Sequence, residues 1–298
     1  MLLDAPLRLW ILFAAQGLVK PDAREFDATS ADRRFHFHGA LQSNLAAAGD
    51  APCPFSGHGT YELFDGGTRL WQRTFHFALA EARVLADGTV AGLAYTESQA
   101  RDQDCAAYVV LAPNGAPRLE QRLPVEVLGR DPAGCIQVPR GWFVDEAHGR
   151  FVAWIWSEPA KREQWNAWSL STGKAVEWRP RLDADPNTYA CAGAEPVPGT
   201  GLVLVHAWRR SERATLYRSE FDLVDADGLR VWSYAVDADR VEGEAGRAAP
   251  GANGIVSVAG GEKPTLRLRC FTDKSIVRFE LAQDATTKAW SAREVGKE

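Results

Sequence analysis

Neither charge sign dominates this sequence, and it has no long uninterrupted apolar run. The 298 residues include 34 lysines and arginines against 39 aspartates and glutamates, a net charge of −5. Nucleic-acid-binding surfaces normally show a basic excess, so we expect no nucleic acid as a partner. The apolar run at 7–19 is shorter than the roughly 20 residues that a membrane helix needs, and Arg8 interrupts it. No membrane span is therefore predicted.

Cysteine is sparse, and no Cys-x-x-Cys pair occurs, which excludes the usual zinc frameworks and dithiol redox motifs. We expect reduced thiols and a cytoplasmic protein, with one or two disulfides as the open alternative. Residues 1–19 have the length of a secretion signal, which would make the protein secreted or periplasmic. Asp4 disfavours the signal, because such segments begin with positive charge. The five cysteines are Cys53, Cys105, Cys135, Cys191 and Cys270.

Catalytic and cofactor motifs are also missing. The sequence has no G-x-S-x-G elbow, no Walker A loop and no G-x-G-x-x-G segment that opens a helix. Acidic residues cluster in turn-like stretches such as 183–185 and 225–227, where carboxylates usually cap the backbone. These stretches lack the full calcium-loop pattern. We predict no catalytic residue, no metal ligand and no cofactor, and the balance leans away from an enzyme.

The feature that is present is an internal repeat. A turn residue and Gly precede about seven mostly apolar residues in four segments, and a fifth segment has Arg33 in the Gly place. Short apolar runs opened by turn residues are typical of strands. Both faces are apolar, which predicts burial on both sides. The repeat anchors stand at positions 33, 88, 149, 201 and 254.

A second pattern accompanies the repeat, in which an apolar run, a polar turn and then a tryptophan follow one another. Turn pairs such as Asp-Gly, Asn-Gly and Thr-Gly between two strand-like runs predict β-hairpins. One copy has Leu119 in the tryptophan place. The other copies end at Trp71, Trp178, Trp232 and Trp290.

The stretch 170–178 (LSTGKAVEW) resembles the tryptophan-docking repeat of quinoprotein-type β-propellers, in the wider WD-repeat-like superfamily, and 221–232 is a looser copy. This resemblance implies four-stranded blades around an axis, with the Trp of one blade packed on its neighbour. Five copies predict an all-β protein, a five-bladed propeller over residues 30–298. The segment 1–29 is expected to supply a clasp strand to the last blade through 10–13. Two separate β domains are the competing architecture.

The resemblance does not extend to quinone-dependent oxidation with calcium. Enzymes of that kind are much longer than this chain, and a common subgroup has an adjacent Cys-Cys pair that this sequence lacks. We therefore expect no quinone and no other cofactor.

If the Gly-led strands are the innermost of each blade, equivalent positions converge on the central channel. This hypothesis places an aromatic and histidine-containing ligand site there. The alternative is that the aromatic side chains fill the space between blades. A metal site made by two of these histidines is disfavoured, because two ligands do not suffice. The candidate channel residues are His38, Tyr95, Trp156, His206 and Trp208.

Trp165 and Trp168 are candidate partner-binding residues. Three positions apart on a strand, they point to opposite faces, so one is expected to be buried and the other exposed. The stretches 158–164 and 182–198 are expected to be inter-blade loops that contact a partner. We predict a non-enzymatic scaffold that binds another protein. The alternative is an enzyme or a small-ligand or glycan-binding propeller with its site in the central funnel, which a pocket with converging carboxylates would favour.

Overall fold

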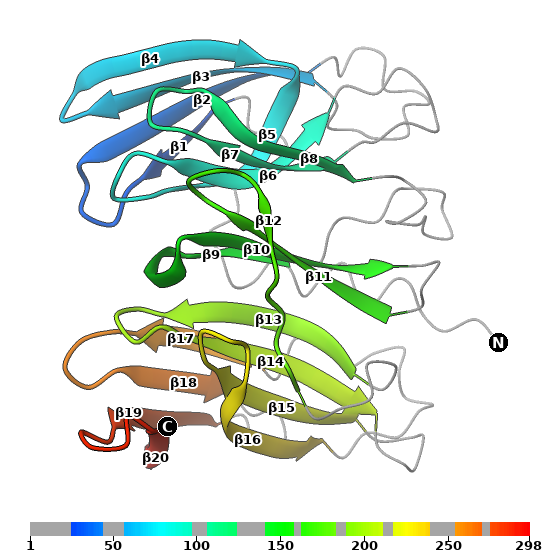
Figure 1. The fold of residues 1–298 in the computed structure, drawn as a ribbon, viewed down its shortest axis with the longest axis vertical. Helices are drawn as coiled ribbons and strands as arrows, with labels where there is room; N and C mark the ends of the chain where they lie inside the picture. Colours follow the sequence, from blue (N-terminus) through cyan, green and yellow to red (C-terminus); the bar gives the residue numbers. More distant parts are fainter. Residues whose placement is uncertain are drawn as a thin grey trace.

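The computed structural model is a five-bladed β-propeller, as predicted (Figure 1). Each blade is a four-stranded antiparallel sheet of consecutive strands, and the five sheets follow one another along the chain. In the described part of the chain, no helix has the length and apolar character needed to cross a bilayer. The structure describes residues 25–43, 57–96, 106–123, 141–157, 162–182, 189–210, 217–238, 254–269 and 275–298.

The strand boundaries follow a regular plan of four strands a blade. The first two blades contain β1 (Glu25–Thr29), β2 (Phe35–Ser43), β3 (Gly57–Asp65), β4 (Thr68–Phe75), β5 (Phe77–Val84), β6 (Val90–Thr96), β7 (Ala106–Leu111) and β8 (Pro117–Leu123). The third contains β9 (Gly141–Asp145), the short 3-10 helix η3 (Glu146–His148), β10 (Arg150–Ser157), β11 (Arg162–Ser169) and β12 (Ala175–Val176). The last two contain β13 (Tyr189–Val197), β14 (Leu202–Arg210), β15 (Tyr217–Val224), β16 (Arg230–Ala238), β17 (Gly254–Ala259), β18 (Thr265–Arg269), β19 (Ile276–Gln283) and β20 (Trp290–Lys297).

The five predicted hairpins are confirmed as the third and fourth strands of each blade. The β3–β4 turn shows why the sequence encodes them. Gly66 and Gly67 have φ angles of 53° and 89°. Positive φ at both central residues suits the tight turns whose twist matches that of the flanking strands, and glycine adopts it without steric cost. The tryptophans of the repeat therefore belong to the outermost part of each blade.

Apolar side chains fill the interfaces between successive blades, which we call seams. One buried cluster occupies each seam from the first blade to the fifth. Trp71 of the first blade donates its indole N–H to the carbonyl of Pro113 in the second blade, at 2.9 Å. Trp232 of the fourth blade meets Phe279 of the fifth edge-on, with ring centroids 5.0 Å apart. The implied packing of a repeat tryptophan on the next blade is thus present.

The expectation that the Gly-led strands are innermost is wrong for four blades. They are the second strands β2, β6, β10 and β14, and the first strands β1, β5, β9, β13 and β17 line the central space. The burial on both faces of β6 comes instead from the two seams that flank it, since its residues alternate between two clusters. In the fifth blade the Gly-led segment is β17, a first strand, so this copy of the repeat is not equivalent to the other four.

Two other expectations need correction. The predicted loop 182–198 contains β13, and the predicted loop 158–164 contains the start of β11. Small residues and Pro196 give β13 a loop-like composition, although it is a nine-residue strand. Residues 25–29 form the first strand of the first blade, and the fifth blade takes four strands from 254–298. The predicted clasp around 10–13 lies outside the described residues, as do all cysteines except Cys191, which is buried.

Candidate functional site

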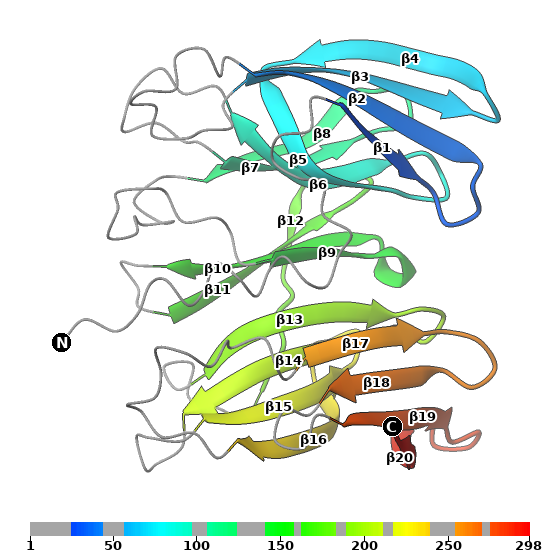
Figure 2. The same ribbon diagram turned by 180° about the vertical axis from the view of Figure 1, so that it is seen from behind.

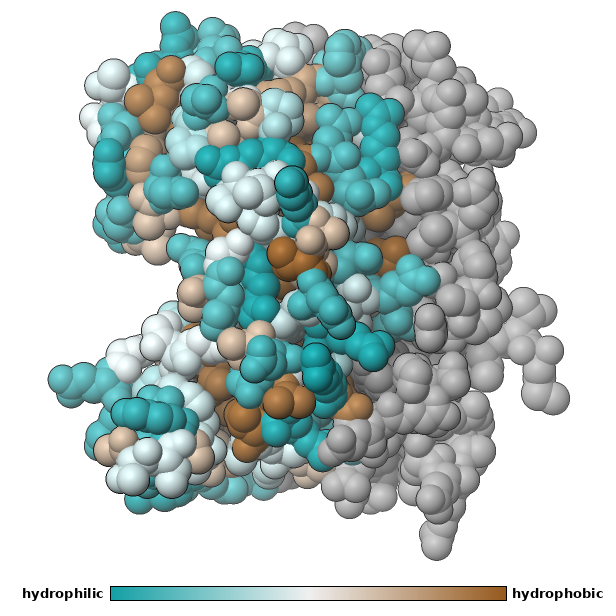
Figure 3. All heavy atoms as spheres, in the orientation of Figure 1, coloured by the Kyte–Doolittle hydropathy of each residue, from teal (hydrophilic) through white to brown (hydrophobic). Residues whose placement is uncertain are grey.

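The first strands of all five blades surround a central pocket of about 690 Å³. Figure 2 shows these strands, β1, β5, β9, β13 and β17, arranged around the middle of the molecule. In Figure 3 the surface is indented between the first two blades and the last two, and hydrophobic residues form small separate areas on this face. The described residues therefore leave this central space unfilled.

Acidic side chains dominate the charge of the pocket lining. Among the described residues, Arg83 is the one guanidinium in it. The carboxylates come from different first strands and from η3, so the arrangement depends on the assembled propeller and not on a local motif. They are Asp27, Glu81, Asp145, Glu146 and Glu195.

Asp145 is the last residue of β9, and its side chain has a structural role. Its side chain is 3% exposed and lies 2.8 Å from Nη2 of Arg150. It also accepts a hydrogen bond from the backbone N–H of His148, which caps η3. The Arg150 guanidinium also donates a hydrogen bond to the carbonyl of Ala226 in the fourth blade and lies over the ring of Trp178. The buried Asp145–Arg150 ion pair therefore links the third blade to the fourth. The two charges neutralise each other, so Asp145 is not the group that would attract a charged ligand.

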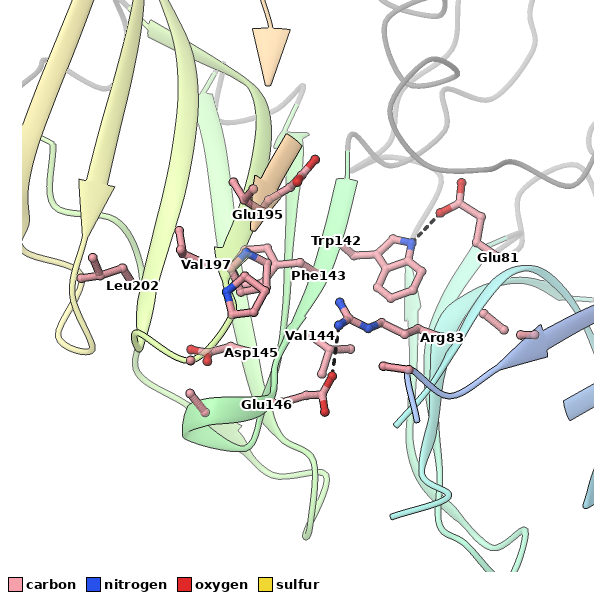
Figure 4. A pocket seen from close by; sticks show the side chains of 18 of the residues that line it. Glu81, Arg83, Trp142, Phe143, Val144, Asp145, Glu146, Glu195, Val197 and Leu202 are labelled. Atoms are coloured by element: carbon pink, nitrogen blue, oxygen red, sulfur yellow. Dashed lines mark hydrogen bonds and ion pairs between the residues drawn. The ribbon is translucent and has the colours of Figure 1, made fainter. Parts of the chain in front are cut away.

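Two contacts between β5 and the β9–η3 segment cross the seam at the pocket wall (Figure 4). Arg83 pairs with Glu146 at 3.0 Å, and Glu81 accepts a hydrogen bond of 2.7 Å from the Trp142 indole. Burial raises the pKa of Glu81, and the indole hydrogen bond opposes that shift. An indole is a neutral donor, so the charge of Glu81 is not neutralised.

Glu195 is the other carboxylate without a cationic partner. It lies on β13 and has no hydrogen bond or ion pair with any residue that the structure describes. Figure 4 shows it with Val197 and Leu202 on the opposite side of Trp142 from Glu81. Burial raises the pKa of Glu195, while the nearby positive charge of Arg83 acts in the opposite direction. A partly desolvated acid that faces a pocket is a recognised sign of a functional site.

The predicted channel residues belong to the second strands β2, β6, β10 and β14. Nδ1 of His38 lies 3.0 Å from the Asp27 carboxylate. His206 is 3% exposed, stacks on Phe221 and lies 3.4 Å from the Ser219 hydroxyl.

Tyr95 packs against the cluster of the second seam, which is the alternative role considered for these aromatic residues. Trp156 and Trp208 are on β10 and β14, and their side chains are outside the described part. The structure therefore does not bring the described members of this set together at the pocket, and ligand binding by them stays a prediction.

Trp165 and Trp168 occupy opposite faces of β11, as predicted. Trp168 is buried in the second seam, whereas Trp165 packs partly buried at the third and stacks on Trp154 at 5.0 Å. Both line a shallow groove of about 210 Å³ beside β12. Their role in binding a partner stays a prediction.

Sequence reasoning missed the residues that line the pocket. Glu81 and Glu195 stand in the stretches FALAEARV and YACAGAEPV, which lack the repeated Gly-led pattern. A usable signal was available, since an isolated carboxylate stands in the strand before each of two Gly-led segments. Among the described residues, no three His, Cys, Asp or Glu side chains gather closely enough to hold a metal ion.

The fold and the pocket define the class of the protein as a five-bladed β-propeller with an acidic central pocket. No known protein family matches the chain, and no curated protein matches it.

Solved structures show a distant likeness. Hydrazine synthase of Kuenenia stuttgartiensis is 9% identical, with a TM-score of 0.43 over 85% of this chain and 63% of that one. Prolyl oligopeptidase B of Galerina marginata is 12% identical, with a TM-score of 0.44 over 91% of this chain and 34% of that one. The periplasmic gluconolactonase of Pseudomonas aeruginosa is 11% identical, with a TM-score of 0.35 over 92% and 85%. Likenesses this weak assign no function.

Proposed function

We propose that this propeller binds a small organic molecule in its central pocket. The observation that carries the proposal is the pocket itself, which combines a volume of about 690 Å³ with Glu81 and Glu195, two partly desolvated carboxylates from different blades. Ligand sites in proteins commonly have this size, with a few polar groups that converge in a mostly apolar lining. The proposal corresponds to the alternative function of the sequence analysis.

A substitution at Ala147 tests this proposal. Ala147 is exposed on η3 and lines the pocket, so Ala147→Trp fills part of the space without disturbing a buried core. We expect ligand-observed NMR to detect binding of at least one of D-glucose, n-pentylamine and pentanoate to the unmodified protein, and loss of that signal in Ala147→Trp. Ala282→Trp, an exposed change in the fifth blade, should retain binding. Binding that is equal in both variants would place the ligand elsewhere and contradict the proposal.

A protein-binding scaffold is the second candidate function. It is supported by the groove beside β12, which contains Trp165 and the 39% exposed Val176. Tryptophans at such positions are frequent hot spots of protein interfaces. A cytoplasmic location and another protein as partner belong to this second candidate.

A further inference from the structure

We propose that the central pocket selects a small organic cation, a protonated amine with an apolar stem, through the carboxylates of Glu81 and Glu195. The inference rests on the ligand-binding function proposed above and adds the chemical class of the ligand. It follows from which charges of the lining are already paired and which are not.

Three of the five lining carboxylates have a cationic or ionisable partner. Asp145 pairs with Arg150 and Glu146 pairs with Arg83, at 2.8 and 3.0 Å. Asp27 lies 2.9 and 3.0 Å from ring nitrogens of His36 and His38. Because Arg83 is paired with Glu146, neither of the remaining two acids forms an ion pair with a lysine or arginine among the described residues.

The two remaining acids come from the blades on either side of the third blade. Glu81 belongs to β5 of the second blade and Glu195 to β13 of the fourth, with β9 between them. Glu81 accepts one indole hydrogen bond, and Glu195 has no partner in the described part of the chain. Because burial disfavours the charged form of each, a cation bound beside them would restore the interaction that water supplies elsewhere.

The lining selects an amine over other ligand charges. An anion would be repelled, because the described lining contains five carboxylates and one guanidinium, that of Arg83, which is already paired with Glu146. A metal ion needs several close ligands, and the described side chains contain no such group. An ammonium group needs fewer fixed partners, because its three N–H donors can bond one carboxylate and nearby backbone carbonyls.

The rest of the lining suits an apolar stem. Half-buried apolar residues from four of the five first strands line the same pocket. They are Ala28 of β1, Ala82 of β5, Pro196 of β13 and Val258 of β17. Covering such surface is favourable at roughly 25 cal/mol per Å². A short aliphatic amine therefore matches both parts of the lining, whereas a carbohydrate would leave this apolar surface uncovered.

The test compares n-pentylamine with 1-pentanol, which has the same stem without the charge. We expect isothermal titration calorimetry to show that the protein binds the amine at least tenfold more tightly than the alcohol. Glu195→Gln should weaken amine binding about tenfold or more, since hydrogen bonds to charged groups are the strong ones, and should leave alcohol binding unchanged. Glu294→Gln, which removes an exposed carboxylate from β20, is the matched control and should change neither.

The outcomes separate this inference from the proposed function. Equal affinities for amine and alcohol, or an amine affinity that Glu195→Gln leaves unchanged, would overturn the cation inference. If D-glucose or pentanoate then binds and Ala147→Trp abolishes that binding, the pocket still functions as a ligand site with another specificity. If Ala147→Trp affects the binding of no probe, both proposals fail. Circular dichroism of Glu195→Gln checks that the variant is folded, and Glu81→Gln provides an independent second variant for the same comparison.

Discussion

Two fully buried tyrosines in the seams differ in whether their hydroxyl groups are hydrogen-bonded. Tyr61 accepts a hydrogen bond of 2.7 Å from the Leu79 N–H and donates one of 3.1 Å to the Phe77 carbonyl, which links the first blade to the second. Tyr108 is equally buried, but its hydroxyl has no hydrogen-bond partner among the described residues.

Replacement of each tyrosine by phenylalanine should therefore have opposite consequences. Tyr61→Phe leaves a buried amide N–H without an acceptor, and we expect the free energy of unfolding to fall by about 1–3 kcal/mol. Tyr108→Phe removes an unsatisfied polar group, so its stability should be unchanged or higher. Urea unfolding of the two variants measures both values. Equal losses in the two variants would show that the hydroxyl contacts of Tyr61 do not stabilise the seam.

His206 gives the protein a specific acid sensitivity. Burial lowers the pKa of His206 to about 3, against a value near 6.5 in an unfolded chain. Above pH 6.5 the imidazole is neutral in both states and has no effect on the pH dependence. As the pH falls from 6.5 towards 3, only the unfolded state takes up the proton, so stability should fall by up to about 1.4 kcal/mol per pH unit.

The variant His206→Gln tests this contribution. Its stability should depend less steeply on pH between 6.5 and 3 than that of the unmodified protein, as measured by urea unfolding at several pH values. If His206→Gln leaves the slope unchanged, the buried imidazole does not cause the acid sensitivity.

We expect a turn that packs against a neighbouring blade to be more sensitive to substitution than a similar turn on the surface. Gly173 and Gly149 both have left-handed backbone, with φ of 69° and 61°. A Cβ at Gly173 would overlap the Arg118 carbonyl of the second blade, whereas nothing lies within 4 Å of one at Gly149. The two glycines therefore have similar φ angles but different surroundings.

Alanine at each position should separate the two costs. Gly149→Ala carries only the backbone penalty, about 1 kcal/mol. Gly173→Ala adds a clash across the seam, and we expect it to be at least about 1–3 kcal/mol more destabilising. Thermal and urea unfolding of both variants provide the measurement. A similar loss in both would mean that the second blade moves aside freely.

The sequence predicts the outer strands better than the inner ones, for a physical reason. The hairpins of the third and fourth strands contain turn residues that only a tight turn explains, such as Gly66 and Gly67. The first strands present one edge to the central pocket, so their composition follows the pocket and not a packed sheet. In β13 this produces small residues, Pro196 and the isolated Glu195, a combination that is typical of a loop.

At the scale of the whole molecule, the repeat period correctly predicts five blades, and the resemblance to propeller repeats correctly implies four strands in each. The period does not predict which strand lies at the axis, because the Gly-led repeat marks the strand with two buried faces and not the strand nearest the centre. The candidate site was missed for the same reason. Glu81 and Glu195 are 114 positions apart by their numbers, and only the arrangement of the blades around a common centre brings their strands to one pocket.

The apolar clusters also determine how the blades support one another. Each cluster joins two consecutive blades, and within the described residues none joins the fifth blade to the first. Each blade is therefore stabilised mainly by its immediate neighbours along the chain. A molecule that contacts Glu81 in the second blade and Glu195 in the fourth would bridge the third blade. Such a molecule would restrict relative motion of the blades at both seams of the third blade.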